Sequence, residues 1–171
     1  SAIVPSGLAG YTVSSDSTVL TVEGGGRVYV FSKSTGRLMK VLVGSREISL
    51  SNGPRLIAAR RSDRSLDQFY NHDDKDAEKQ KTPYAEYQDQ GVFSGFEVKD
   101  IQGDKVLTAH YKFGCLQEVV WHFLPDSRVK MDYQYSFGGV VDEMGITFDY
   151  PEAKVRSKSW VGQGPYRIWQ N

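Results

Sequence analysis

The sequence predicts an all-β protein folded as an antiparallel β-sandwich, and two observations carry that prediction. Apolar and polar residues alternate along most of the chain, which is the period-two pattern of strands that bury one face. Short clusters rich in Gly, Ser and Asp separate the alternating runs and are typical of tight turns. No stretch has apolar residues at helical spacing over three turns, so no long amphipathic helix is expected.

The first part of the chain contains a series of alternating runs. They are residues 11–15, 17–24, 26–33, 37–44 and 46–61. Turns are expected between them at "SSDS", "EGGGR" and "KSTGR". Such runs with short connections favour neighbouring antiparallel strands over parallel strands with long crossovers.

A second alternating series covers residues 91–150, with hairpin turns expected at "QGDK" and "PDSR". Residues 62–90 between the two series are polar, charged and poor in aliphatic side chains, which predicts a long polar loop. This segment also contains the aromatic residues Phe69, Tyr70, Tyr84 and Tyr87. Because long loops in compact domains often serve function, the alternative is that it folds over a groove.

Composition argues against several classes of protein. Lys plus Arg and Asp plus Glu each number 21, and this zero formal charge disfavours generic nucleic-acid binding. No apolar run approaches the roughly 20 residues that a membrane helix needs, and no secretory signal is expected within the given residues. Cys115 is the single cysteine, so an internal disulfide or a Cys-based zinc site is not expected. We expect it to be a small buried residue.

Motifs for cofactors and metals are weak. "VGQGP" has glycines but is followed by a proline and a strand-like run, whereas a phosphate loop needs a helix there. "NHDDKD" offers oxygen ligands, but it lacks the glycine and terminal Glu of a calcium loop and reads as a solvated acidic turn. We therefore expect no cofactor and no bound metal.

The sequence shows no recognisable set of catalytic residues either. The histidines His72, His110 and His122 are far apart in sequence and form no metal motif. No G-x-S-x-G nucleophile elbow is present. Five carboxylates lie near strand positions without a spacing that singles out a pair: Glu118, Asp132, Asp142, Glu143 and Asp149. No catalytic residue is predicted.

Aromatic and basic residues gather at the end of the sequence. Trp160, Tyr166 and Trp169 lie close to Arg156, Lys158 and Arg167. Flat rings stack on the apolar faces of sugars while charged groups bind their hydroxyl rims, so this cluster suggests carbohydrate binding. The alternative is that the tryptophans are core residues, because large rings dominate cores.

"WVGQGPYRIWQN" resembles the W-x-G-x-G-P-x-E-N-Y-x-D stretch in the C-terminal domain of family 2 glycoside hydrolases of the β-galactosidase type. Trp160, Gly162, Gly164 and Pro165 match, and Trp169 falls on the tyrosine. Upstream, "VYVFSKSTGRLMKVLVGSREI" is similar to the F-x-x-x-x-G-x-L opening of that domain through Phe31, Gly36 and Leu38.

The resemblance implies a large β-sandwich, the supersandwich related to galactose mutarotases. In that family the catalytic carboxylates lie on a separate (β/α)₈ barrel, and the sandwich domain forms one wall of the sugar pocket. Residues 1–171 would then be one non-catalytic sandwich domain, or its N-terminal portion, from a larger hydrolase. The implied partners are carbohydrate and the other domains of that enzyme, and the implied location is secreted or periplasmic.

The chain departs from the family pattern at Arg167-Ile168, where the family has Glu-Asn. Arginine suits planar carboxylates or sulfate, so we expect an acidic or sulfated glycan. The family's W-R-A-P-T-D-N-D-like stretch has no good counterpart. The nearest candidates for pocket residues are Arg60, Asp63, His72 and Asp74.

Two other functions stay open from the sequence. One is a stand-alone carbohydrate-binding module. The other is a mutarotase-like epimerase, in which His110 or His122 would act with Glu118 in proton transfer.

Overall fold

The computed structural model of the protein describes residues 10–61, 84–139, 141 and 143–157. Within these residues the chain forms twelve strands and one three-residue 3-10 helix, η2 (Glu152–Lys154). The strands before residue 62 are β1 (Thr12–Ser15), β2 (Val19–Gly24), β3 (Arg27–Ser32), β4 (Leu38–Val43), β5 (Arg46–Ile48) and β6 (Ser51–Arg61). Those after residue 83 are β7 (Tyr84–Gln88), β8 (Val92–Ile101), β9 (Asp104–Lys112), β10 (Leu116–Phe123), β11 (Val129–Tyr135) and β12 (Glu143–Asp149).

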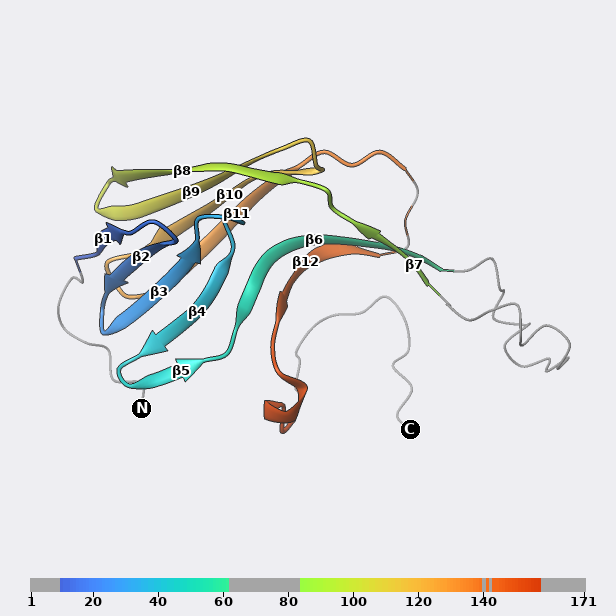
Figure 1. Cartoon of the computed structure of the whole chain (residues 1–171). Helices are drawn as coiled ribbons and strands as arrows, with labels where there is room; N and C mark the ends of the chain where they lie inside the picture. The colour runs from blue at the N-terminus through green and yellow to red at the C-terminus, as the bar shows by residue number, and fades with distance from the viewer. Residues whose placement is uncertain (1–9, 62–83, 140, 142, 158–171) are drawn as a thin grey trace, which may run out of the picture.

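The strands form two antiparallel sheets that face each other (Figure 1). The larger sheet has eight strands in the order β1-β2-β3-β4-β6-β12, with β5 paired to β4 and β7 paired to β6. The smaller sheet has four strands in the order β11-β10-β9-β8. The predicted all-β antiparallel sandwich is confirmed.

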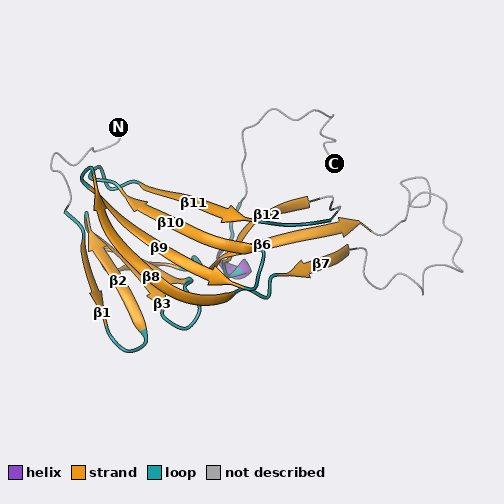
Figure 2. Cartoon of the chain, turned by 90° about the horizontal axis from the view of Figure 1, so that it is seen from above, coloured by secondary structure: helices purple, strands orange, loops and turns teal. Residues whose placement is uncertain are grey.

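β6 connects two parts of the larger sheet. It pairs with β4 at one position, where Leu38 lies opposite Gly53. Farther along, β6 pairs with β12 on one side and, from Ile57 onward, with β7 on the other. β6, β7 and β12 therefore extend past the first four strands as a separate arm of the sheet (Figure 2).

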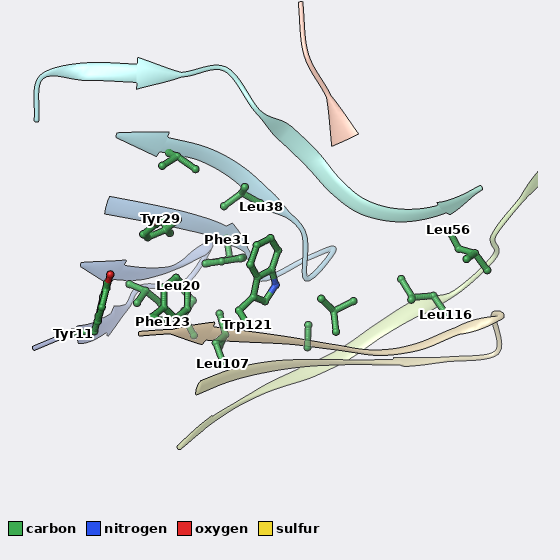
Figure 3. Packing of buried hydrophobic residues seen from close by; sticks show 14 residues of the cluster. Tyr11, Leu20, Tyr29, Phe31, Leu38, Leu56, Leu107, Leu116, Trp121 and Phe123 are labelled. Carbon is green, nitrogen blue, oxygen red and sulfur yellow. The ribbon is translucent and has the colours of Figure 1, made fainter. Parts of the chain in front are cut away.

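The core lies between the two sheets and follows the alternation in the sequence (Figure 3). Along β10, Val119, Trp121 and Phe123 are buried, whereas Glu118 and His122 are partly exposed on the opposite face. Phe31 of β3 is fully buried. Its ring packs edge-on at centroid distances of 5.4–6.4 Å against the rings of Phe96, Trp121 and Phe123.

All five predicted turns connect antiparallel strands. The turn between β1 and β2 is organised by Asp16, whose Oδ1 accepts hydrogen bonds from the amides of Thr18 (2.7 Å) and Val19 (2.8 Å). The Thr18 hydroxyl donates to the same oxygen at 3.0 Å. This Asx-type arrangement lets a side chain satisfy backbone donors that the turn leaves unpaired.

The Asp16 turn predicts a pH dependence of stability. Hydrogen bonds from the Val19 and Thr18 amides lower the pKa of Asp16, so the folded state favours the ionised carboxylate. The resulting stabilisation is present above the unfolded-state pKa and is lost as pH falls through the lower folded-state pKa. Urea unfolding at pH 7 and pH 3 should show a smaller stability difference between the wild type and Asp16→Asn at pH 3. An equal difference at both pH values would contradict this assignment.

The end of the predicted 62–90 loop is a strand. Residues 84–88 form β7, which pairs with residues 57–61 of β6. The ring of Tyr87 contacts that of Phe137 edge-on at 5.2 Å. The strand depends on the exposed edge of β6 and on this tertiary contact, neither of which a local pattern reveals. Residues 62–83 lie outside the described residues.

Candidate functional site

A pocket of about 440 Å³ lies where β6 separates from β4. β6 contributes residues 54–57, and Arg37 comes from the residue just before β4. The other lining residues come from β7 and the loop after it and from β9, β10 and β12: Tyr87, Asp89, Gly91, Tyr111, Leu116 and Thr147. Residues far apart in sequence therefore meet at this point.

A chain of polar contacts holds the two arginines that line the pocket, Arg37 and Arg55. Arg37 Nη1 donates a hydrogen bond to Asn52 Oδ1 at 3.2 Å. Asn52 Nδ2 in turn donates to Asp149 Oδ2 at 2.7 Å, and Asp149 Oδ1 pairs with the guanidinium of Arg55. Because each side chain holds the next, both guanidinium groups are oriented before any ligand binds.

Asp89 organises another part of the pocket wall. Its carboxylate accepts hydrogen bonds from the backbone amides of Cys115 (2.8 Å), Leu116 (3.0 Å) and Gly91 (3.3 Å). These contacts join the loop after β7 to the start of β10. Asp89 therefore has a clear structural role, because its oxygens satisfy amides that no strand pairing serves.

Tyr87 and Cys115 add a further contact on this wall. The hydroxyl of Tyr87 lies 3.0 Å from Cys115 Sγ. This hydrogen bond, with burial and the nearby charge of Asp89 adding to it, raises the pKa of Tyr87 to about 12. Cys115 is only partly buried, so the expectation of a buried residue is met only in part.

Tyr111 brings a neutral hydroxyl to the pocket. Burial raises its pKa to about 12, although the positive charge of Arg37 acts in the opposite direction. Its hydroxyl is buried and has no hydrogen-bond partner among the described residues. The Nε of Arg55 is likewise buried without a partner in that part of the chain. Two residues of the pocket lining therefore have unpaired polar atoms that are shielded from solvent, and Arg55 Nε can only donate.

The sequence-predicted site lies almost wholly outside the described residues. Arg60 lies on β6, but its side chain is not among the described residues. The other predicted positions also lie outside them: Asp63, His72, Asp74, Trp160, Tyr166, Arg167 and Trp169. The predicted site thus stays a prediction.

The two described histidines lie on the outer face of the smaller sheet, away from the pocket. His110 Nδ1 is 3.3 Å from Glu118 Oε2, and His110 Nε2 is 4.0 Å from Glu97 Oε2. His122 Nε2 instead lies 3.1 Å from Asp132 Oδ2. Of the two pairings considered from sequence, the structure forms His110 with Glu118.

Sequence reasoning missed the residues that line the pocket. Arg37 looks like part of a turn, and Arg55 and Tyr111 look like ordinary members of alternating strands. The only local signal is an arginine inside the mainly apolar run "PRLIAA", because a charge there needs a partner.

Comparison with known proteins assigns no family: no protein-family model and no curated protein matches this chain. Among the described residues, no helix is long and apolar enough to cross a membrane. In the same residues, no group of three or more His, Cys, Asp or Glu side chains could hold a metal ion.

Proposed function

We propose that this chain is a non-catalytic β-sandwich domain of a family 2 glycoside hydrolase of the β-galactosidase type. In this proposal the domain contributes to carbohydrate binding and to packing against other domains of a secreted or periplasmic enzyme. The antiparallel sandwich supports the proposal at the level of fold. The relation to the mutarotase supersandwich is part of the proposal.

The three residues behind the upstream resemblance occupy positions that the sandwich constrains. Phe31 and Leu38 are buried, at 0% and 1% exposure. Gly36 has a φ of +69°, and a side chain there would meet the ring of Phe93. The packing of β3 and β4 against the smaller sheet accounts for these residue types at these positions of the chain.

The observation that carries the carbohydrate-binding proposal is the pocket beside β6 that Arg37 and Tyr111 also line. Its volume of about 440 Å³ is within the roughly 300–1,000 Å³ range of small-molecule sites. Its walls combine the rings of Tyr87 and Tyr111 with two guanidinium groups. Sugars need both kinds of contact, since rings pack against C–H faces and planar polar groups bind hydroxyls.

Isothermal titration with a panel of neutral and acidic oligosaccharides tests the binding part of this proposal. We expect at least one oligosaccharide to bind the wild-type chain and to bind Tyr111→Phe more weakly, because that variant keeps the ring and loses the hydroxyl. No binding across the panel would contradict carbohydrate recognition by this domain.

The sequence of the complete reading frame tests the parent-enzyme part. A (β/α)₈ barrel with paired glutamates in the same chain is the expected finding. A reading frame with no such barrel, in a chain that still binds sugar, would establish a stand-alone carbohydrate-binding module instead.

The contact between His110 and Glu118 supports one alternative function, an epimerase that interconverts sugar anomers. A histidine held by a carboxylate at 3.3 Å can take or give a proton. NMR measurement of anomer exchange in free galactose would detect this activity. For an epimerase, catalysis by the wild type should disappear in His110→Ala and remain in His122→Ala, whose histidine pairs with Asp132 instead.

A further inference from the structure

We propose that the pocket lined by Arg37, Arg55 and Tyr111 recognises the carboxylate of an acidic sugar residue, an inference that rests on the proposed carbohydrate-binding function. The groups that would bind the carboxylate are Arg37, Arg55 and Tyr111.

The first argument is that two polar atoms of the pocket lining lack a hydrogen-bond partner. The buried Tyr111 hydroxyl and Arg55 Nε have no partner in the described part of the chain. Leaving a buried donor unpaired destabilises the folded state. Both atoms are shielded from solvent, so a ligand with acceptor oxygens pairs with them only when the side chains that cover them shift, and Arg55 Nε can only donate.

The second argument is charge. Arg37 hydrogen-bonds to the neutral amide of Asn52, and no described carboxylate forms an ion pair with it. The guanidinium of Arg37 is close enough to Tyr111 to influence its pKa. A carboxylate placed beside both would supply the missing negative charge and an acceptor for the phenol.

The third argument concerns the acidic residues already present. Asp149 uses one oxygen for Asn52 and the other for Arg55. Asp89 uses its oxygens for three backbone amides. Both carboxylates are therefore engaged in holding the walls in place. Neither forms an ion pair with Arg37, so a ligand carboxylate can provide that contact.

Carboxylate chemistry fits this arrangement better than sulfate. A carboxylate is planar and offers two oxygens to the side-by-side donors of a guanidinium, which is the geometry that arginine binds in two-point contacts. Two arginines and a phenol at the edge of one pocket give such a group three donors.

The test uses the wild-type chain and three trisaccharides that differ at one sugar: galacturonate, galactose and sulfated galactose. Isothermal titration at low salt should give galacturonate an affinity at least about tenfold above that of galactose, the size expected for one hydrogen bond to a charged group. Arg37→Gln should remove this preference. Tyr111→Phe should weaken galacturonate binding by about fivefold or more.

Arg128→Gln is the matched control for charge. It also removes one positive charge, but Arg128 is exposed and pairs with Asp126 in the turn between β10 and β11. We expect the galacturonate preference to persist in this variant. Thermal unfolding of each variant establishes that the fold is retained, and amide NMR shifts at Gly36 and Arg37 on titration locate the binding.

The outcomes separate this inference from the function on which it rests. Equal binding of galacturonate and galactose overturns the carboxylate inference and leaves carbohydrate binding intact. Equal binding of galacturonate and sulfated galactose overturns the choice of carboxylate over sulfate. A preference lost equally in Arg37→Gln and Arg128→Gln shows general charge attraction and overturns the assigned site. Binding of none of the three overturns both proposals.

Discussion

Replacing Phe31 with alanine is expected to lower the free energy of unfolding by about 3–5 kcal/mol. The side chain has no exposed surface, and its ring contacts three other aromatic rings from the smaller sheet. Removing it loses the burial of the ring and leaves a cavity between the sheets that rigid neighbours fill only in part. Urea denaturation, with the midpoint and slope fitted together, measures the change.

The chain provides a matched control for this substitution. Phe113 lies in the turn between β9 and β10 and is 90% exposed. The same change at this position, Phe113→Ala, removes the same atoms without opening a cavity. It should alter the free energy of unfolding by no more than about 0.5 kcal/mol. Similar losses at the two positions would mean that the sheets do not pack around Phe31 as described.

The second large effect is expected for Gly36→Ala, which should lower the free energy of unfolding by about 2–5 kcal/mol. Gly36 has a φ of +69°, which alone costs an alanine about 1–2 kcal/mol. A Cβ here would also lie 2.3 Å from Phe93 Cδ2 and 2.8 Å from the Tyr111 hydroxyl. Since both rings are held in the sandwich, relieving the overlap adds the cost of overpacking, about 1–3 kcal/mol.

Gly26→Ala separates the two contributions. Gly26 has almost the same backbone conformation, with a φ of +72°, but no atom lies within 4 Å of the position of a Cβ. Alanine there should cost only the conformational part, about 1–2 kcal/mol. The difference between the two variants, measured by urea unfolding, is the steric contribution. A difference of zero would show that the rings move aside freely.

The strands and turns could be predicted from sequence because they depend on local patterns. Along β10, the alternation of Val119, Trp121 and Phe123 with polar residues decides which face is buried. The Asp16 turn is equally local, since its hydrogen bonds reach only to Thr18 and Val19. β7 was not predicted because its formation depends on the edge of β6, which is distant in sequence.

The pocket could not be predicted for the same physical reason. Arg37, Arg55 and Tyr111 belong to separate segments, and only the divergence of β6 from β4 places them around one space. Sequence reasoning instead weighted clusters of aromatic and charged residues, such as Trp160 with Arg167, that lie outside the described residues. Local composition can suggest a binding chemistry, but it does not locate a site assembled by long-range packing.

The single pairing of Leu38 with Gly53 has a consequence for how ligand binding and folding are linked. On the β4 side of this junction lies Arg37, and on the β6 side lies Arg55. A ligand that contacts both arginines spans the junction and binds only when the two parts of the sheet are together. By mass action, such a ligand raises the free energy of separating them. Occupancy of the pocket would therefore strengthen the junction between β4 and β6 to a degree that grows with the concentration of the ligand.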